Sequence, residues 1–328
     1  MTEKIKGITE LPLILEREFR GWDAHWIEHG SLTLVVVPQV GGRIMGVLWK
    51  GQELSFVNPD CQGRVLDIAS VADIHRAKQQ FGFLLWGGDK TWLAPQGRWT
   101  DSDPFLDLDS GTYEMSVDPV TSAVTMISPV CRETGVQIER TVSVGANADT
   151  WTVASRLTNT SGQPVRWAPW DVDMMLRPAT VFMPTSSTSV FPQGVKTFDN
   201  EGESASVRDD VVRFVDDIAV ISCKEAVKFK YGVDAEEGRI LAVFEPAGRG
   251  PVGYRKTVPT YHPQPYGHGC VLEIFNSSLY PYIEMEVHGP VIDLQPGQDF
   301  TLRVDSALFD LDAVPATPEA IRTALGFE

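Results

Sequence analysis

Short runs of apolar residues, separated by turn-forming residues, recur along most of the chain. These runs cover residues 32–37, 44–49, 112–117, 123–127, 135–144, 150–158, 211–214, 218–222, 240–244, 270–275, 282–287 and 300–309. Short strands at a spacing of roughly ten residues are typical of a β-sandwich or a β-barrel. The pattern therefore predicts an all-β protein built from antiparallel strands.

Helical signals are few. One short helix is predicted over residues 71–80 and a second over 317–326. In the second, Thr317 can cap the first turn, Pro318 fits at its start and Gly326 can end it. We find no internal repeat and no linker. We therefore expect one domain over residues 1–328, with its core at about 20–310 and the C-terminal helix at 317–326.

The composition narrows the range of partners. Of the 328 residues, 43% are hydrophobic, and 44 acidic against 28 basic side chains give a net charge of −16. This charge would repel nucleic acid and anionic membrane surfaces, so neither is expected as a partner. The four cysteines are far apart, and we find neither a secretion signal nor a membrane-spanning stretch. We expect a cytoplasmic protein without disulfide bonds or a zinc site.

The segment 282–288, YIEMEVH, alternates polar and apolar residues. Alternate side chains of a β-strand point to opposite faces, so Tyr282, Glu284, Glu286 and His288 would share one face. The apolar residues between them would face the core. Burying two carboxylates and an imidazole is costly unless they are paired. The polar face is therefore expected to meet water, a charged partner or a polar pocket, the usual setting for general acid–base chemistry.

Residues 83–99, FLLWGGDKTWLAPQGRW, combine three tryptophans with glycines and charged side chains. Aromatic faces can stack on sugar rings, while groups such as Asp89, Lys90 and Gln96 can bond hydroxyls. We interpret this segment as a binding loop at the mouth of a β scaffold. The alternative is a buried aromatic corner with Asp89 and Lys90 paired at its edge. For the similar segment 166–173, with Trp170 and Asp171, pocket lining and core packing are both open.

Three of the six histidines come late in the chain. His262 and His268 belong to a loop rich in proline and glycine before the strand that carries Glu273, and His288 follows. This spacing is a weak signal for metal ligands, so no metal is expected, and a substrate contact or a plain loop role is preferred. The sequence also lacks a P-loop, a dinucleotide-binding glycine motif, a GxSxG nucleophile and an HExxH site. We therefore expect no cofactor.

Several short motifs follow one another along the chain. They are Gly41-Gly-Arg-Ile44, Trp86-Gly-Gly-Asp-Lys90 with Trp92 and Pro95-Gln96, Lys230-Tyr-Gly232, Leu272-Glu273, Tyr282-Ile-Glu-Met-Glu286 and Leu294-Gln-Pro-Gly297. Taken in this order, the motifs resemble a bacterial branch of the galactose-mutarotase-like (aldose 1-epimerase-like) superfamily, over roughly residues 20–310. The resemblance implies a β-supersandwich, in which two large curved antiparallel sheets face each other and one concave face holds a sugar cleft.

In aldose 1-epimerases, a late glutamate takes the proton of the anomeric hydroxyl and a histidine protonates the ring oxygen, so that the ring opens and recloses on either face. By this resemblance Glu284 is the base, with Glu286 as the alternative on the same face. Trp170, next to Asp171, stands where the histidine is expected, and glycine and Asp89 replace a second histidine. The acid is then one of four residues: Lys90, Lys230, His262 or His268.

We hypothesise that the protein binds a mono- or oligosaccharide and catalyses an aldose 1-epimerase-like isomerisation. The candidate catalytic residues are Glu284, Glu286, Lys90 and Lys230. The candidate substrate contacts are Arg43, Trp86, Asp89, Trp92, Gln96, Trp170, Asp171, His262, His268, Glu273 and His288. The alternatives are a non-catalytic carbohydrate-binding or sensing protein, and a lyase or hydrolase for uronate-containing oligosaccharides. The last would need a second carboxylate across the cleft from Glu284, supplied by Asp89 or Asp171.

Overall fold

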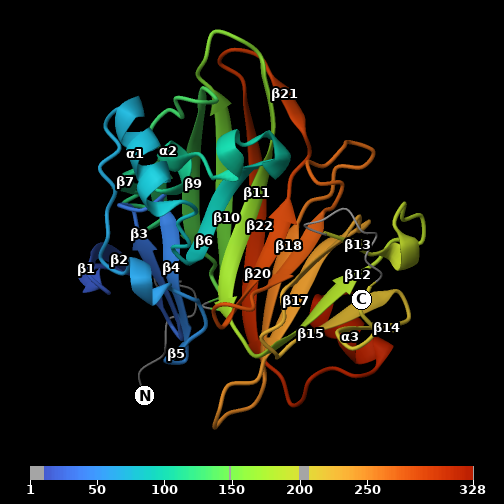
Figure 1. The fold of residues 1–328 in the computed structure, drawn as a ribbon. Helices are drawn as coiled ribbons and strands as arrows, with labels where there is room; N and C mark the ends of the chain where they lie inside the picture. Colours follow the sequence, from blue (N-terminus) through green and yellow to red (C-terminus); the bar gives the residue numbers. More distant parts are fainter. Residues whose placement is uncertain (1–10, 148, 199–206, 328) are drawn as a thin grey trace, which may run out of the picture.

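Two large antiparallel sheets make up most of the chain (Figure 1). The computed structural model describes residues 11–147, 149–198 and 207–327. One sheet has 12 strands and the other has 10. The prediction of an all-β protein with two facing antiparallel sheets is confirmed.

The larger sheet carries most of the motifs that the sequence singles out. In spatial order it contains β1 (Leu13–Phe19), β2 (Trp22–His29), β3 (Leu32–Val37), β4 (Arg43–Trp49), β6 (Gly88–Ala94), β11 (Val165–Leu176), β20 (Tyr282–His288), β19 (Leu272–Asn276), β16 (Phe229–Val233) and β13 (Lys196–Thr197). Two short strands lie off this path: β5 (Gln52–Glu53) pairs with β4, and β21 (Ile292–Leu294) pairs with β11.

The smaller sheet covers one face of the larger one. In spatial order it contains β14 (Val212–Val215), β15 (Ile218–Cys223), β12 (Ala179–Pro184), β17 (Gly238–Phe244), β18 (Val252–Val258), β22 (Asp299–Asp310), β10 (Thr150–Asn159), β9 (Val136–Val144), β8 (Val124–Ile127) and β7 (Glu114–Val117).

The main core lies between the two sheets. Ile283, Met285 and Val287 of β20 pack there, together with Leu302 and Val304 of β22. The alternation predicted for residues 282–288 is therefore confirmed: the apolar side chains face the smaller sheet, and the polar side chains of β20 face away from it.

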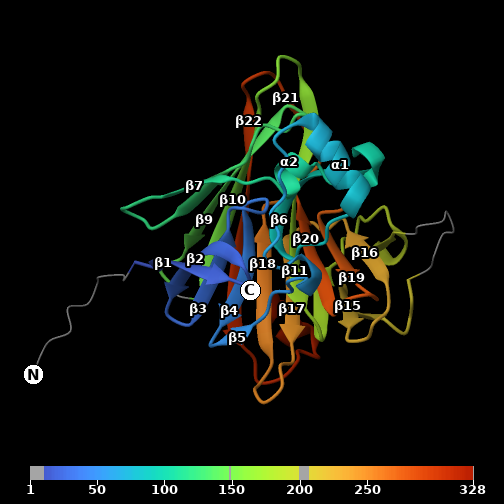
Figure 2. The ribbon, with the colours of Figure 1, turned by 60° about the vertical axis from the view of Figure 1, so that its left-hand side comes forward.

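Three α-helices and four 3₁₀ turns complete the described chain. The helices are α1 (Val71–Phe81), α2 (Leu106–Asp109) and α3 (Pro318–Leu325), and the turns are Pro59–Cys61, Gln96–Arg98, Thr100–Ser102 and Pro192–Gly194. Both predicted helices are confirmed, and α3 is capped by the Thr317 side chain and ends at Gly326 in the left-handed conformation. Figure 2 shows α1 and α2 together near one end of β6.

Two central strands were not predicted as strands. Residues 83–99 were expected to form a binding loop, but residues 88–94 are β6, and β11 contains the whole segment 166–173. Every residue of β6 is buried. Both faces of this strand are covered by other parts of the chain, and polar and apolar side chains occur on each face. The sequence of β6 therefore shows no apolar–polar alternation.

A buried ionic network joins the inner faces of the two sheets. Asp89 of β6 pairs with Arg140 of β9, and Asp171 of β11 pairs with Lys256 of β18. Lys256 Nζ also lies 3.4 Å from Asp89 Oδ2. All four side chains are almost fully buried. Asp89 and Asp171, which we expected to contact a sugar, therefore face the smaller sheet and are neutralised there.

Two further observations concern membrane-spanning helices and the state of the cysteines. Within the described residues, no helix is both long enough and apolar enough to span a bilayer. Cys61, Cys131, Cys223 and Cys270 are buried free thiols.

Replacing Arg140 with Met should lower the free energy of unfolding by about 3–5 kcal/mol, because Asp89 would stay buried without its closest partner. Urea denaturation at neutral pH measures this change. The control is Arg17→Met, which removes an ion pair with Glu28 on the exposed edge of the larger sheet and should cost less than about 1 kcal/mol. Equal costs for the two variants would contradict the role given to the buried network.

Candidate functional site

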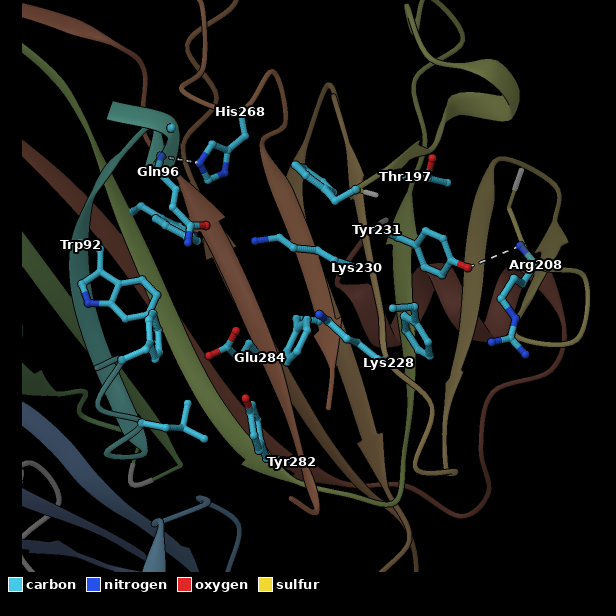
Figure 3. Close-up of a pocket in the computed structure, with 17 residues that line it drawn as sticks. Trp92, Gln96, Thr197, Arg208, Lys228, Lys230, Tyr231, His268, Tyr282 and Glu284 are labelled. Carbon is cyan, nitrogen blue, oxygen red and sulfur yellow. Dashed lines mark hydrogen bonds between the residues drawn. The ribbon is translucent and has the colours of Figure 1, made fainter. Parts of the chain in front are cut away.

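A cleft of about 830 Å³ opens on the larger sheet. Tyr282 and Glu284 of β20, whose side chains face away from the smaller sheet, lie on its floor (Figure 3). The lining residues are Phe83, Leu85, Trp92, Gln96, Gly97, Trp170, Thr197, Phe198, Arg208, Lys228, Phe229, Lys230, Tyr231, His268, Phe275, Tyr282 and Glu284.

Strand register brings residues from four segments of the sequence into adjacent rows. Lys90, Val172, Glu286 and Glu273 lie opposite one another across β6, β11, β20 and β19. Met174, Glu284, Phe275 and Lys230 form the next row, across β11, β20, β19 and β16. Neighbouring strands are about 4.8 Å apart, so long side chains can reach from one row to the other.

The charged groups of the two rows pair diagonally. Lys90 Nζ lies 3.3 Å from Glu284 Oε1. Lys230 Nζ lies 2.7 Å from Glu273 Oε2 and 2.8 Å from Glu286 Oε2. Glu273 and Glu286 are fully buried, whereas the Glu284 side chain is 12% exposed. Among the described lining residues, Glu284 is the single carboxylate that reaches the cleft.

The two buried carboxylates have opposite electrostatic settings. Burial raises the pKa of Glu286 well above its usual value, and the attraction of Lys230 only partly offsets this. Burial would also raise the pKa of Glu273, but Lys230 and His288 outweigh it and hold that pKa well below the usual range. Burial opposes the charge of Lys230 as well, but the two carboxylates prevail and raise its pKa. We conclude that Lys230 and Glu273 carry opposite charges near neutral pH.

The electrostatic environment of Lys90 differs from that of Lys230. Burial lowers the pKa of its ammonium, and the nearby Glu284 carboxylate only partly offsets the effect. The Nζ atom also lies over the ring of Trp92, 4.4 Å from its centroid. A buried lysine with a lowered pKa gives up its proton more readily than a solvated one, which suits it to acid–base chemistry.

Trp92 and Trp170 line one wall of the cleft, and the fully buried His288 packs beside Trp170 without lining it. Trp92, Trp170 and His288 lie opposite one another on β6, β11 and β20. The rings of Trp92 and Trp170 are 5.1 Å apart in an edge-on arrangement, and Trp170 stacks on His288 at 5.4 Å. The Trp170 indole donates a hydrogen bond to Glu286 Oε2 at 2.8 Å, which fixes the ring. Such a wall offers apolar surface for a ligand.

Arg43 and Trp86 lie behind this wall rather than in the cleft. Arg43 pairs with the Asp109 carboxylate, which also accepts a hydrogen bond from the Trp92 indole at 2.8 Å. The Trp86 indole donates to Ser110 Oγ, and that hydroxyl donates to Asp109 Oδ2. Neither residue touches the cleft, where both were expected. They hold Asp109, and Asp109 orients Trp92.

His268 lines the cleft with both ring nitrogens engaged. Its Nε2 accepts a hydrogen bond from the backbone N–H of Gln96 at 3.0 Å (Figure 3). The remaining nitrogen, Nδ1, therefore carries the hydrogen and donates it to Glu273 Oε1 at 3.0 Å. His262 lies apart from this group, with Nε2 2.9 Å from the carbonyl oxygen of Ala235. Of the two loop histidines expected at the site, His268 lines the cleft and His262 does not.

His268, Glu273 and His288 each bring one possible metal-ligand atom to within 4.8 Å of the others. Lys230 already holds the Glu273 carboxylate at 2.7 Å. The His268 nitrogen that faces Glu273 carries a hydrogen, because the other nitrogen accepts one from Gln96. A cation would have to displace that proton and lie beside an ammonium group. These contacts favour a hydrogen-bonded network over a metal site.

Several lining residues were not singled out from the sequence. Phe275 could have been found, because it alternates with Glu273 on one strand and must share its face. Phe198 and Arg208 come from segments without a strand-like alternation, so only the folded chain shows that they line the cleft.

No family model and no curated protein matches the chain. Among solved structures, it is similar to a protein from Escherichia coli K12 described as a candidate aldose 1-epimerase, at 15% identity over 88% of this chain and 99% of that one, with a TM-score of 0.58. A galactose mutarotase-like protein from Lactobacillus casei ATCC 334 matches at 11% identity over 87% and 100% of the two chains, with a TM-score of 0.56.

A galactose mutarotase-like protein from Clostridium acetobutylicum matches at 9% identity over 92% of this chain and 99% of that one, with a TM-score of 0.55. These similarities cover nearly the whole length of each neighbour. The chain therefore has the galactose mutarotase-like fold, as the resemblance of its motifs implied.

The His288→Gln variant should gain stability relative to the unchanged protein as the pH falls. Burial lowers the pKa of His288 to about 4, whereas an unfolded chain binds the proton near pH 6.5. Between these values protonation favours unfolding, so wild-type His288 costs stability that grows to about 3 kcal/mol at pH 4.

Urea denaturation of both proteins at several pH values between 7 and 4 measures the difference. The matched control is His75→Gln, at an exposed histidine on α1. A difference between wild type and His288→Gln that stays constant over this range would show that His288 is not held neutral by burial.

Proposed function

We propose that the protein binds a mono- or oligosaccharide in the cleft and catalyses an aldose 1-epimerase-like interconversion of its anomers. The observation that carries this proposal is the contact between Glu284 and Lys90. It sets a carboxylate and an ammonium 3.3 Å apart beside an aromatic wall. The names of the fold neighbours, which include mutarotase-like proteins and a candidate aldose 1-epimerase, support the same chemistry.

Anomer interconversion needs an acid and a base side by side, because the anomeric hydroxyl and the ring oxygen are bonded to the same carbon. In the proposed reaction Glu284 takes the hydroxyl proton while Lys90 donates a proton to the ring oxygen. The bond between the anomeric carbon and the ring oxygen breaks, which gives the open-chain aldehyde. After rotation about the neighbouring carbon–carbon bond, the steps run in reverse on the other face. Both proton transfers are then undone.

Lys90 is preferred to Lys230 as the acid for an electrostatic reason. Burial lowers the pKa of Lys90, whereas the carboxylates of Glu273 and Glu286 raise that of Lys230. Lys230 therefore keeps its proton and serves to hold the buried carboxylates in place. Trp92 and Trp170 would stack on the sugar, and the side chain of Gln96 stands where it can bond the sugar's hydroxyls.

A non-catalytic carbohydrate-binding protein is the second candidate. It is favoured by Trp170, which occupies the position where the resemblance places the catalytic histidine and donates its N–H to Glu286. The engaged nitrogens of His268 favour it too. The hydrolase alternative loses its support, because Asp89 and Asp171 face the smaller sheet and pair there with Arg140 and Lys256.

The cytoplasmic location expected from the sequence remains part of this proposal. Four buried free thiols suit a reducing compartment.

Glu284→Gln should slow anomer exchange by at least about 100-fold, because the amide cannot accept the hydroxyl proton. Exchange spectroscopy by NMR on a panel of aldoses measures the rate, and calorimetry on the same variant measures binding. Glu237→Gln, at an exposed position in the turn before β17, is the matched control. An unchanged rate over the whole panel would rule out Glu284 as the base, and tight binding without exchange in the wild type would establish the non-catalytic alternative.

Lys90→Arg should keep the ion pair with Glu284 but slow exchange by about 100-fold, since a guanidinium does not donate its proton near neutral pH. Sugar affinity should change little. In the wild type the rate should fall as the pH rises through the lowered pKa of Lys90. Full activity of Lys90→Arg with an unchanged pH profile would exclude Lys90 as the acid and leave Lys230 to be tested by the same substitution.

A further inference from the structure

The charge of the cleft is opposite to that of the chain. The whole sequence has 44 acidic and 28 basic side chains. The described residues that line the cleft include three cations, Arg208, Lys228 and Lys230, against one carboxylate, Glu284. A positively charged cleft in a strongly negative protein attracts anionic ligands and repels cationic ones.

Two of these three cations are compensated. Lys230 is held between Glu273 and Glu286, at 2.7 and 2.8 Å. Arg208 pairs with Asp210, which accepts from its Nε at 3.0 Å. Lys228 differs from both, because it is exposed and has no ion pair or hydrogen bond with any part of the chain that the structure describes. The Glu284 carboxylate is itself compensated by Lys90. The net positive charge of the described lining therefore rests on Lys228.

Lys228 also has a suitable position relative to the reacting groups. Figure 3 shows Lys230 of β16, and Lys228 just before this strand, extending into the cavity toward the side that holds Glu284. Lys230, Phe275 and Glu284 occupy one row of three adjacent strands, which places the backbones of Lys230 and Glu284 about 10 Å apart. Lys228 precedes Lys230 by two residues. A pyranose with its anomeric carbon at Glu284 would extend its far substituent across this gap.

We propose that the sugar bound by this cleft carries an anionic group, a carboxylate or a phosphate, and that the Lys228 ammonium binds it. The inference rests on the proposed function and names its class of substrate. Lysine is a mobile point charge that pairs with either anion, whereas a bidentate arginine would select the geometry of one. The aromatic wall and the Glu284–Lys90 pair then recognise the ring, and Lys228 recognises the charge.

The test compares sugars that differ at a single substituent. D-glucose, D-glucuronate and D-glucose 6-phosphate form one set, and the corresponding galactose derivatives form a second. Calorimetry at low and high ionic strength should show the anionic members binding at least about 10-fold tighter than the neutral sugar. High salt should reduce this preference. If only the uronate binds more tightly, the anionic group is a carboxylate. If only the phosphate ester does, it is a phosphate. If both do, the site recognises negative charge in either form.

Lys228→Met should abolish the preference, so that the anionic sugars bind no more tightly than the neutral sugar. Lys224→Met is the matched control, since it removes the same charge from an exposed lysine that pairs with Glu245 on another surface, at 2.5 Å. Equal affinity for neutral and anionic members, or a preference that survives Lys228→Met, overturns this inference while the proposed function stands. Failure of every sugar to bind overturns the proposed function, and this inference with it.

Discussion

The pairing of buried charges on three central strands is the constraint on which the rest of the structure depends. Charged side chains point toward the smaller sheet from β6 and β11, and away from it from β6 and β20. An ion removed from water costs several kcal/mol unless a partner neutralises it. Asp89 and Asp171 can therefore lie between the sheets only because β9 and β18 bring Arg140 and Lys256 to meet them. Packing of the two sheets against each other therefore requires that these buried aspartates pair with their cations.

The same constraint shapes the cleft on the opposite face. Lys230 contacts two buried carboxylates and carries the charge opposite to that of Glu273, and Lys90 pairs with Glu284. What remains accessible is one carboxylate with a buried lysine beside it, an aromatic wall, and the Lys228 ammonium, for which the described residues supply no ion pair or hydrogen bond. The fold is shared with mutarotase-like proteins, but the acid–base pair proposed for this chain is a glutamate and a lysine, with Trp170 in the place of the expected histidine.

Part of the site could be predicted from the sequence because strand alternation is a local property. The order of residues 282–288 fixed the shared face of Glu284, Glu286 and His288, and β20 has these limits. The pairing of Asp89 could also have been anticipated. Arg140 stands among apolar residues on the buried face of β9, and a cation there requires a buried anion. The loop interpretation was wrong for residues 88–94, which form β6, since a strand covered on both faces loses the alternation that identifies strands.

The sequence by itself determined the all-β class, the two capped helices and the polar face of the late strand, because each depends on the spacing of neighbouring residues. Only the tertiary structure decided which charged groups meet. The residues that pair across β6, β11, β20 and β16 are separated by tens to hundreds of positions, and their contacts depend on strand order and register. Whether Asp171 faces a ligand or Lys256, and whether Lys228 has a partner among the described residues, follows from that arrangement and from no local pattern.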